Sequence, residues 1–118
     1  MSSGDDVQSV LLSLNGKHGI LGCLLVDQEG GVIGSSLPEE TDTGTLGAIS
    51  ATLFSNNDVS IQRMNRGNLV QMTLLTDQGI LHFCQAGTNI LVVLTAAGQR
   101  INLEGLIRSV EEQGAVLA

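Results

Sequence analysis

The chain has 118 residues, of which 42% are hydrophobic and only 14% charged, and its formal net charge is −7. That length fits a single domain, taken here as residues 1–118, and leaves little room for a second core. Five basic residues against twelve acidic ones provide no positive field for nucleic acid or an anionic membrane surface. The charged fraction lies well below the roughly 25% of an ordinary soluble domain. We therefore expect another chain to cover part of this surface.

The N-terminal residues and the apolar runs bear on where in the cell the protein is located. The longest apolar runs, 20–26 and 90–97, are too short to span a bilayer, so no direct membrane insertion is expected. Residues 1–6 lack the positive charge and apolar stretch of a signal peptide, which predicts a cytoplasmic protein. Cys23 and Cys84 lie in apolar runs and are interpreted as small buried hydrophobes. The sequence does not determine whether they pair, and a cytosolic chain would normally keep them reduced.

The first half of the chain predicts a helix, a hairpin and a long helix. From Asp5 onward, apolar residues follow one helical face: Val7, Val10, Leu11 and Leu14. Runs 19–26 and 32–37 flank a glycine turn and predict a hairpin, with the first strand central and the second at an edge. A second helix is expected over about 43–65, capped by Thr41 or Asp42, with an interruption or a specific contact at 55–58, where helix propensity is poor.

The second half predicts three strands, over 69–76, 80–85 and 90–95, joined by turns short enough to make neighbours antiparallel. In the first of them Val70, Met72 and Leu74 are expected on the core face. A last helix is expected to begin with Asn102 as its cap. The predicted fold is α+β, in the order α-β-β-α-β-β-β-α, with a five-stranded antiparallel sheet and helices on its faces.

Catalytic patterns are scarce. No nucleotide-binding loop occurs, and the histidines, His18 and His82, are far apart with no Cys-x-x-Cys pair, so no metal, cofactor or catalytic residue is assigned. His82 and Cys84 share a strand face and could form a base and nucleophile, but no third orienting group is evident. The sequence therefore predicts a protein that is not an enzyme.

Two segments give the chain a resemblance to the roadblock/dynein light chain family. Residues 19–35, GILGCLLVDQEGGVIGS, resemble the family's first hairpin, and residues 101–108, INLEGLIR, are similar to the start of its last helix. The long second helix also matches the family in its position along the chain, and the resemblance covers about residues 7–110. It implies a longin/profilin-like sheet, and a homodimer in which the second helix and third strand of each subunit meet and the two sheets join.

Carried onto this chain, the resemblance assigns nine residues to a dimer interface: Leu46, Ile49, Ser50, Leu53, Phe54, Asn57, Leu69, Gln71 and Thr73. The second helix is also apolar around more of its circumference than one sheet can cover, although each of these residues could instead belong to the core of its own chain.

Family members regulate or scaffold small Ras-like GTPases, so the resemblance implies such a partner. Arg63 and Arg66 are the clustered basic residues that could contact it, although a solvated helix end would also explain them, and the shortage of basic residues argues against an arginine finger. The alternative is a purely structural dimerisation module of a larger assembly, such as a dynein light chain-like or membrane-associated complex.

Overall fold

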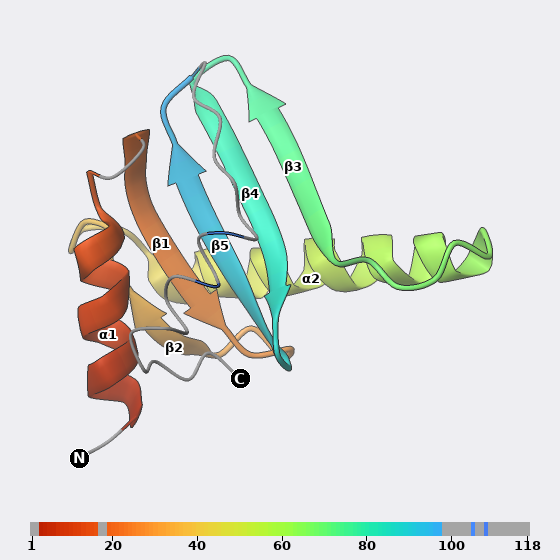
Figure 1. Cartoon of the computed structure of the whole chain (residues 1–118), viewed down its shortest axis with the longest axis horizontal. Helices are drawn as coiled ribbons and strands as arrows, with labels where there is room; N and C mark the ends of the chain where they lie inside the picture. Colours follow the sequence, from red (N-terminus) through yellow and green to blue (C-terminus); the bar gives the residue numbers. More distant parts are fainter. Residues whose placement is uncertain (1–2, 17–18, 98–104, 106–107, 109–118) are drawn as a thin grey trace.

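The computed structural model describes residues 3–16, 19–97, 105 and 108, and these form two helices and one five-stranded antiparallel sheet (Figure 1). The elements are α1 (Ser3–Leu14), β1 (Ile20–Val26), β2 (Val32–Ser35), α2 (Thr43–Arg63), β3 (Gln71–Thr76), β4 (Gly79–Ala86) and β5 (Asn89–Thr95). The predicted order α-β-β-α-β-β-β is confirmed. The predicted last helix lies outside the described residues, except for Gly105 and Arg108, which are helical.

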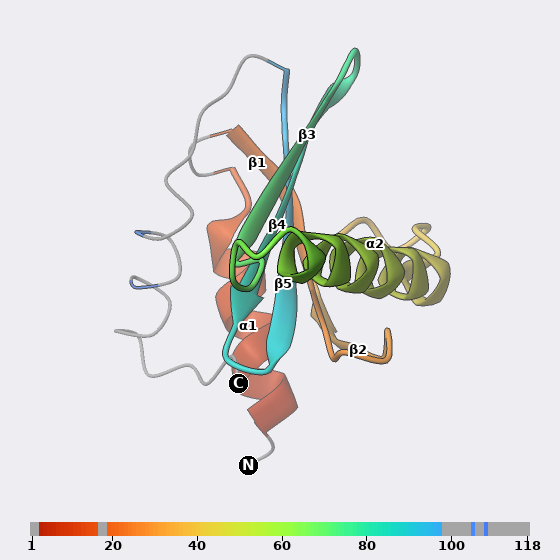
Figure 2. The ribbon, with the colours of Figure 1, turned by 90° about the vertical axis from the view of Figure 1, so that its right-hand side faces the viewer.

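The strands lie in the order β2-β1-β5-β4-β3, so β1 is internal and β2 is an edge, as predicted, while β3 forms the opposite edge. α1 covers one face of the sheet and α2 crosses the other (Figure 2). Because successive side chains of a strand point to opposite faces, the apolar run of β1 supplies both cores. Cys23 and Leu25 pack on the α1 side, and Leu24 and Val26 on the α2 side.

α2 is held at its cap and in its second turn. The carboxylate of Asp42 accepts hydrogen bonds from the Thr45 hydroxyl at 2.7 Å and the Thr45 N–H at 3.1 Å, which hold the pKa of Asp42 below its ordinary value. Further along, Gly47 allows close contact with the β1–β2 turn, since a Cβ there would lie 2.7 Å from the Gly30 carbonyl oxygen. The cap and the close contact fix where α2 crosses the sheet.

The expected irregularity at 55–58 is a contact rather than a break. α2 is continuous from Thr43 to Arg63, and the Asp58 carboxylate accepts a hydrogen bond from the Leu69 N–H at 2.7 Å. This bond ties the segment that returns from α2 to the beginning of β3.

One part of the predicted pattern is wrong. Val70, expected on the core face, is 66% exposed, whereas Leu69 packs against the core under α2. The strand begins only at Gln71, and Asp58 fixes the backbone of Leu69, so the two-residue alternation does not extend to 69–70. Met72 and Leu74 do pack on the predicted side.

Candidate functional site

The β3 edge of the sheet has open hydrogen-bonding groups. β3 pairs with β4 in the register Thr73↔His82, and the Gln85 N–H donates to the Val70 carbonyl at 3.0 Å. Since hydrogen-bonded positions alternate in an antiparallel pair, the backbone N–H and C=O groups of Gln71, Thr73 and Leu75 point away from β4. No other residue in the described ranges hydrogen bonds to them. This edge is a template on which a further strand can pair.

The outer face of α2 adds an apolar surface. Ile49 is 53% and Leu53 36% exposed, and Val59 and Met64 are exposed farther along. The inner face packs on the sheet through Ala51 and Phe54. With apolar side chains on both sides, α2 leaves an exposed apolar surface on the side away from the sheet, a surface of the kind that a partner can cover.

The helix also extends beyond its own sheet. In Figure 1, α2 crosses behind the strands and its green C-terminal half projects past β3. The fully buried residues of α2 end at Phe54, and exposed Arg63 and Arg66 lie at or just after the projecting end. These last turns therefore have little of their own chain to pack on.

The structure divides the nine predicted interface residues into two groups. Five of them are exposed: Ile49, Leu53, Asn57, Gln71 and Thr73. The other four are buried or partly buried within the chain: Leu46, Ser50, Phe54 and Leu69. The exposed residues can contact a partner directly, and the buried ones shape the surface from below. Sequence reasoning missed Val59 as an exposed apolar position, because periodicity does not show how far a helix extends past a sheet edge. It also missed Val70, because the alternation of β3 does not extend to 69–70.

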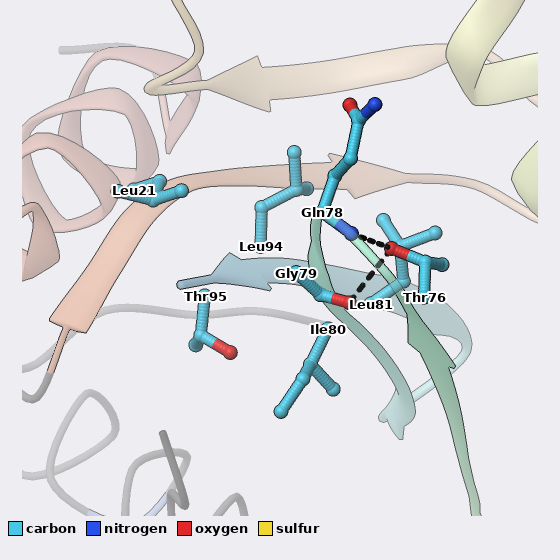
Figure 3. Close-up of a pocket in the computed structure, with 8 residues that line it drawn as sticks. All are labelled: Leu21, Thr76, Gln78, Gly79, Ile80, Leu81, Leu94 and Thr95. Carbon is cyan, nitrogen blue, oxygen red and sulfur yellow. Dashed lines mark hydrogen bonds between the residues drawn. The ribbon is translucent and has the colours of Figure 1, made fainter. Parts of the chain in front are cut away.

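A shallow hollow of about 190 Å³ lies at the end of the sheet away from α2 (Figure 3). Its apolar walls include Leu21, Leu81 and Leu94, and Leu81 and Leu94 belong to the face that α2 crosses. Its other lining residues are Thr76, Gln78, Gly79, Ile80 and Thr95, none of which is charged. The Thr76 hydroxyl donates to the Gly79 carbonyl at 2.8 Å and accepts from the Gln78 N–H at 3.2 Å. Because the Thr76 hydroxyl forms these two bonds within the turn, the hollow suits an apolar side chain of a partner.

The residues examined for catalysis are built into the core. His82 is buried, its Nε2 lies 3.2 Å from the Thr95 hydroxyl, and burial lowers its pKa. Burial raises the pKa of Cys23 to about 11 and that of Cys84 to about 12, so both thiols are poor nucleophiles near neutral pH. Within the described part of the chain no group of three or more potential metal ligands is present, and no helix has the length and apolarity needed to cross a membrane.

Comparison with known proteins gives the family. The model of the Roadblock/LC7 domain matches residues 6–96. The chain belongs to this family. The uncharacterized protein MJ0310 of Methanocaldococcus jannaschii is 36% identical over 109 residues, which cover 92% of this chain and 93% of the relative.

Solved structures show the same fold at lower identity. Myxococcus xanthus MglB has a TM-score of 0.79 at 17% identity, covering 99% of this chain and 87% of that one. The Roadblock/LC7 domain from Streptomyces avermitilis has a TM-score of 0.77 at 18% identity, covering 90% and 95%. An MglB structure described as having a tetrameric arrangement has a TM-score of 0.77 at 16% identity, covering 98% and 86%. The roadblock fold is thus established for this chain by sequence and structure together.

Proposed function

We propose that this Roadblock/LC7 protein is a homodimeric, non-enzymatic regulator that binds a small Ras-like GTPase. The observation that carries the dimer is the β3 edge, where no other described residue pairs with the backbone groups of Gln71, Thr73 and Leu75, beside an α2 that is apolar on its outer face. The two features are adjacent and together supply what a self-associating surface needs: generic backbone pairing and apolar area.

Pairing of two β3 edges fixes the rest of the dimer. An antiparallel β3–β3 pair has a twofold axis perpendicular to the sheet and produces one ten-stranded sheet. Both α2 helices then lie on the same face and run antiparallel. Because each α2 projects past its own β3 (Figure 1), its exposed Val59 and Met64 come over the partner's sheet, on the face that holds the apolar hollow. The dimer would cover surfaces that a single chain leaves open.

The GTPase assignment is supported by family membership and by the fold shared with MglB. A protein without catalytic groups can still regulate a GTPase by binding one conformation of its switch regions more tightly than the other. Exposed Arg63 and Arg66 are the proposed contact for the acidic surface of such a partner.

The dimer is tested by Thr73→Pro. Proline lacks an N–H, but the Thr73 N–H points away from β4, so the substitution preserves pairing within the chain and is tolerated at an edge. We expect sedimentation velocity at micromolar concentration to show a dimer for the wild type and for Thr73→Val, and a monomer for Thr73→Pro. A wild-type monomer would contradict the proposed dimer.

The GTPase assignment is tested by titrating the purified protein with a small Ras-like GTPase of the same organism, loaded with GDP or with a GTP analogue. We expect tighter binding to one nucleotide state and a changed rate of hydrolysis or exchange. An Arg63→Glu, Arg66→Glu variant that remains dimeric should bind more weakly. A dimer that binds neither nucleotide state of the GTPase would instead favour the structural dimerisation module.

A further inference from the structure

The two edges of the sheet differ in their contacts with the described residues. None of these residues pairs with the outward groups of β3, whereas at β2 the side chain of Gln8, on α1, reaches the backbone of Ser35. The Ser36 N–H donates to the Cys23 carbonyl at 2.8 Å, so the alternation of the ladder turns the N–H and C=O groups of Ser35 away from β1. These are the groups with which an added strand would pair.

Gln8 occupies both of them. Its Oε1 accepts a hydrogen bond from the Ser35 N–H at 2.9 Å, and its Nε2 donates to the Ser35 carbonyl oxygen. A primary amide offers one acceptor and two donors in a plane, so it matches an outward-facing N–H and C=O as the backbone of a neighbouring strand would. Gln8 thus supplies one strand-like contact without a strand.

The position of α1 holds this side chain in place. A Cβ on Gly34 would lie 3.1 Å from a Val7 methyl group and 3.2 Å from a Leu11 methyl group, so the glycine lets α1 approach β2 closely. Val7 and Leu11 are buried under α1 in the core. The helix is therefore anchored beside the strand, and Gln8 extends from it to the edge.

We propose that Gln8 is a plug that closes the β2 edge and prevents the sheet from growing through it. If two chains pair through β3, as proposed above, both outer edges of the joined sheet are β2 edges. An unprotected β2 edge could pair with the same edge of another dimer, and alternating β3 and β2 contacts would give an open chain rather than a closed assembly. With Gln8 in place, growth through the sheet stops at two chains. The limit of two chains rests on the proposed dimer, whereas the closing of the β2 edge by Gln8 does not.

The test is to shorten the Gln8 side chain and measure the size of the assembly. Gln8→Ala and Gln8→Ser both have side chains too short to reach Ser35, and the serine variant keeps the position polar. We expect sedimentation velocity to show species larger than the wild type that grow with concentration. At dilutions where these species do not form, hydrogen exchange of the Ser35 amide should be faster than in the wild type. Ser9→Ala, a change at an exposed neighbour on α1, should behave as the wild type.

A second substitution shows which surface is responsible. Val32→Lys adds a charge to the exposed part of β2, where lysine discourages strand pairing, and should restore the wild-type size to Gln8→Ala. Large species that persist in the double variant would show association through another surface and overturn the proposal. So would Gln8 variants that keep the wild-type size.

The inference can be separated from the proposed dimer in the Thr73→Pro background. There the β3 edge is blocked, and adding Gln8→Ala should convert a monomer into a β2-paired dimer. That step is expected even if the wild-type protein proves to be a monomer, so the plug and the β3 dimer can fail independently.

Discussion

Replacing Ile49 by alanine is the most direct measure of what the outer face of α2 contributes. The change removes about three methylene equivalents, each worth about 0.8 kcal/mol when fully buried. Ile49 is 53% exposed in the single chain, so only about half of that value is available to a partner. This gives about 1.2 kcal/mol for each copy. Because the twofold axis repeats the contact, the dimer should lose about 2.5 kcal/mol, and its Kd should rise about 60-fold.

Leu12 provides a matched control. It lies on α1 and is also 53% exposed, so Leu12→Ala removes the same number of carbons from an equally accessible helix position. Its effect on dimer affinity should be within about twofold, since isolated surface substitutions change stability by about 0.5 kcal/mol or less.

The assay is sedimentation equilibrium or light scattering over a dilution series, with circular dichroism to verify that both variants are folded. Equal effects of the two substitutions would show that α2 has no special role. An unchanged Kd for Ile49→Ala would refute the placement of Ile49 in the interface, even if the protein is a dimer.

Three further predictions concern the chain itself. Gly47→Ala should lower the free energy of unfolding, measured in thermal melts, by about 1–3 kcal/mol, because its Cβ would lie 2.7 Å from a backbone oxygen. Gly44→Ala is the control: the nearest neighbour of its Cβ lies at 3.7 Å, so it should raise the free energy of unfolding by about 0.5–1 kcal/mol. Asp58→Ala should cost about 1.5–3 kcal/mol in urea unfolding through loss of a hydrogen bond to a charged group, and Asp58→Asn, which keeps an acceptor, less. Burial raises the pKa of Cys23 to about 11 and of Cys84 to about 12 from 9.0. The unfolded chain therefore releases thiol protons that the folded chain retains, so stability should fall as the pH rises from 9 toward 11, by up to about 1.4 kcal/mol per pH unit for each thiol. A Cys23→Ala, Cys84→Ala variant should show a flatter profile over that range.

Much of the fold could be predicted because local and global signals agree. The apolar run of β1 is buried on both faces, the Asp42 cap starts α2, and the short turns make β3, β4 and β5 neighbours. Where a tertiary contact competes with the local pattern, the prediction fails. Leu69, whose N–H is bonded to Asp58, packs against the core and Val70 beside it is exposed, and periodicity does not encode that bond.

The candidate site was less predictable for a related reason. Helical periodicity identifies the apolar residues of α2 but does not say which of them the sheet covers. Phe54 is buried in the chain and Leu53, its neighbour, is exposed, a difference set by the crossing of helix and sheet. The role of Gln8 has no sequence signal, since its partners are backbone atoms 27 residues away.

In the proposed dimer, the projecting end of α2 would couple folding to association. Turns that lack a buried side of their own gain little from packing within the chain, and short helices are marginal in water without such packing. The proposed dimer would supply that packing, so by mass action each chain should be more stable where its concentration is higher. For this protein, cellular abundance would then set both the fraction assembled and how completely its longest helix is formed.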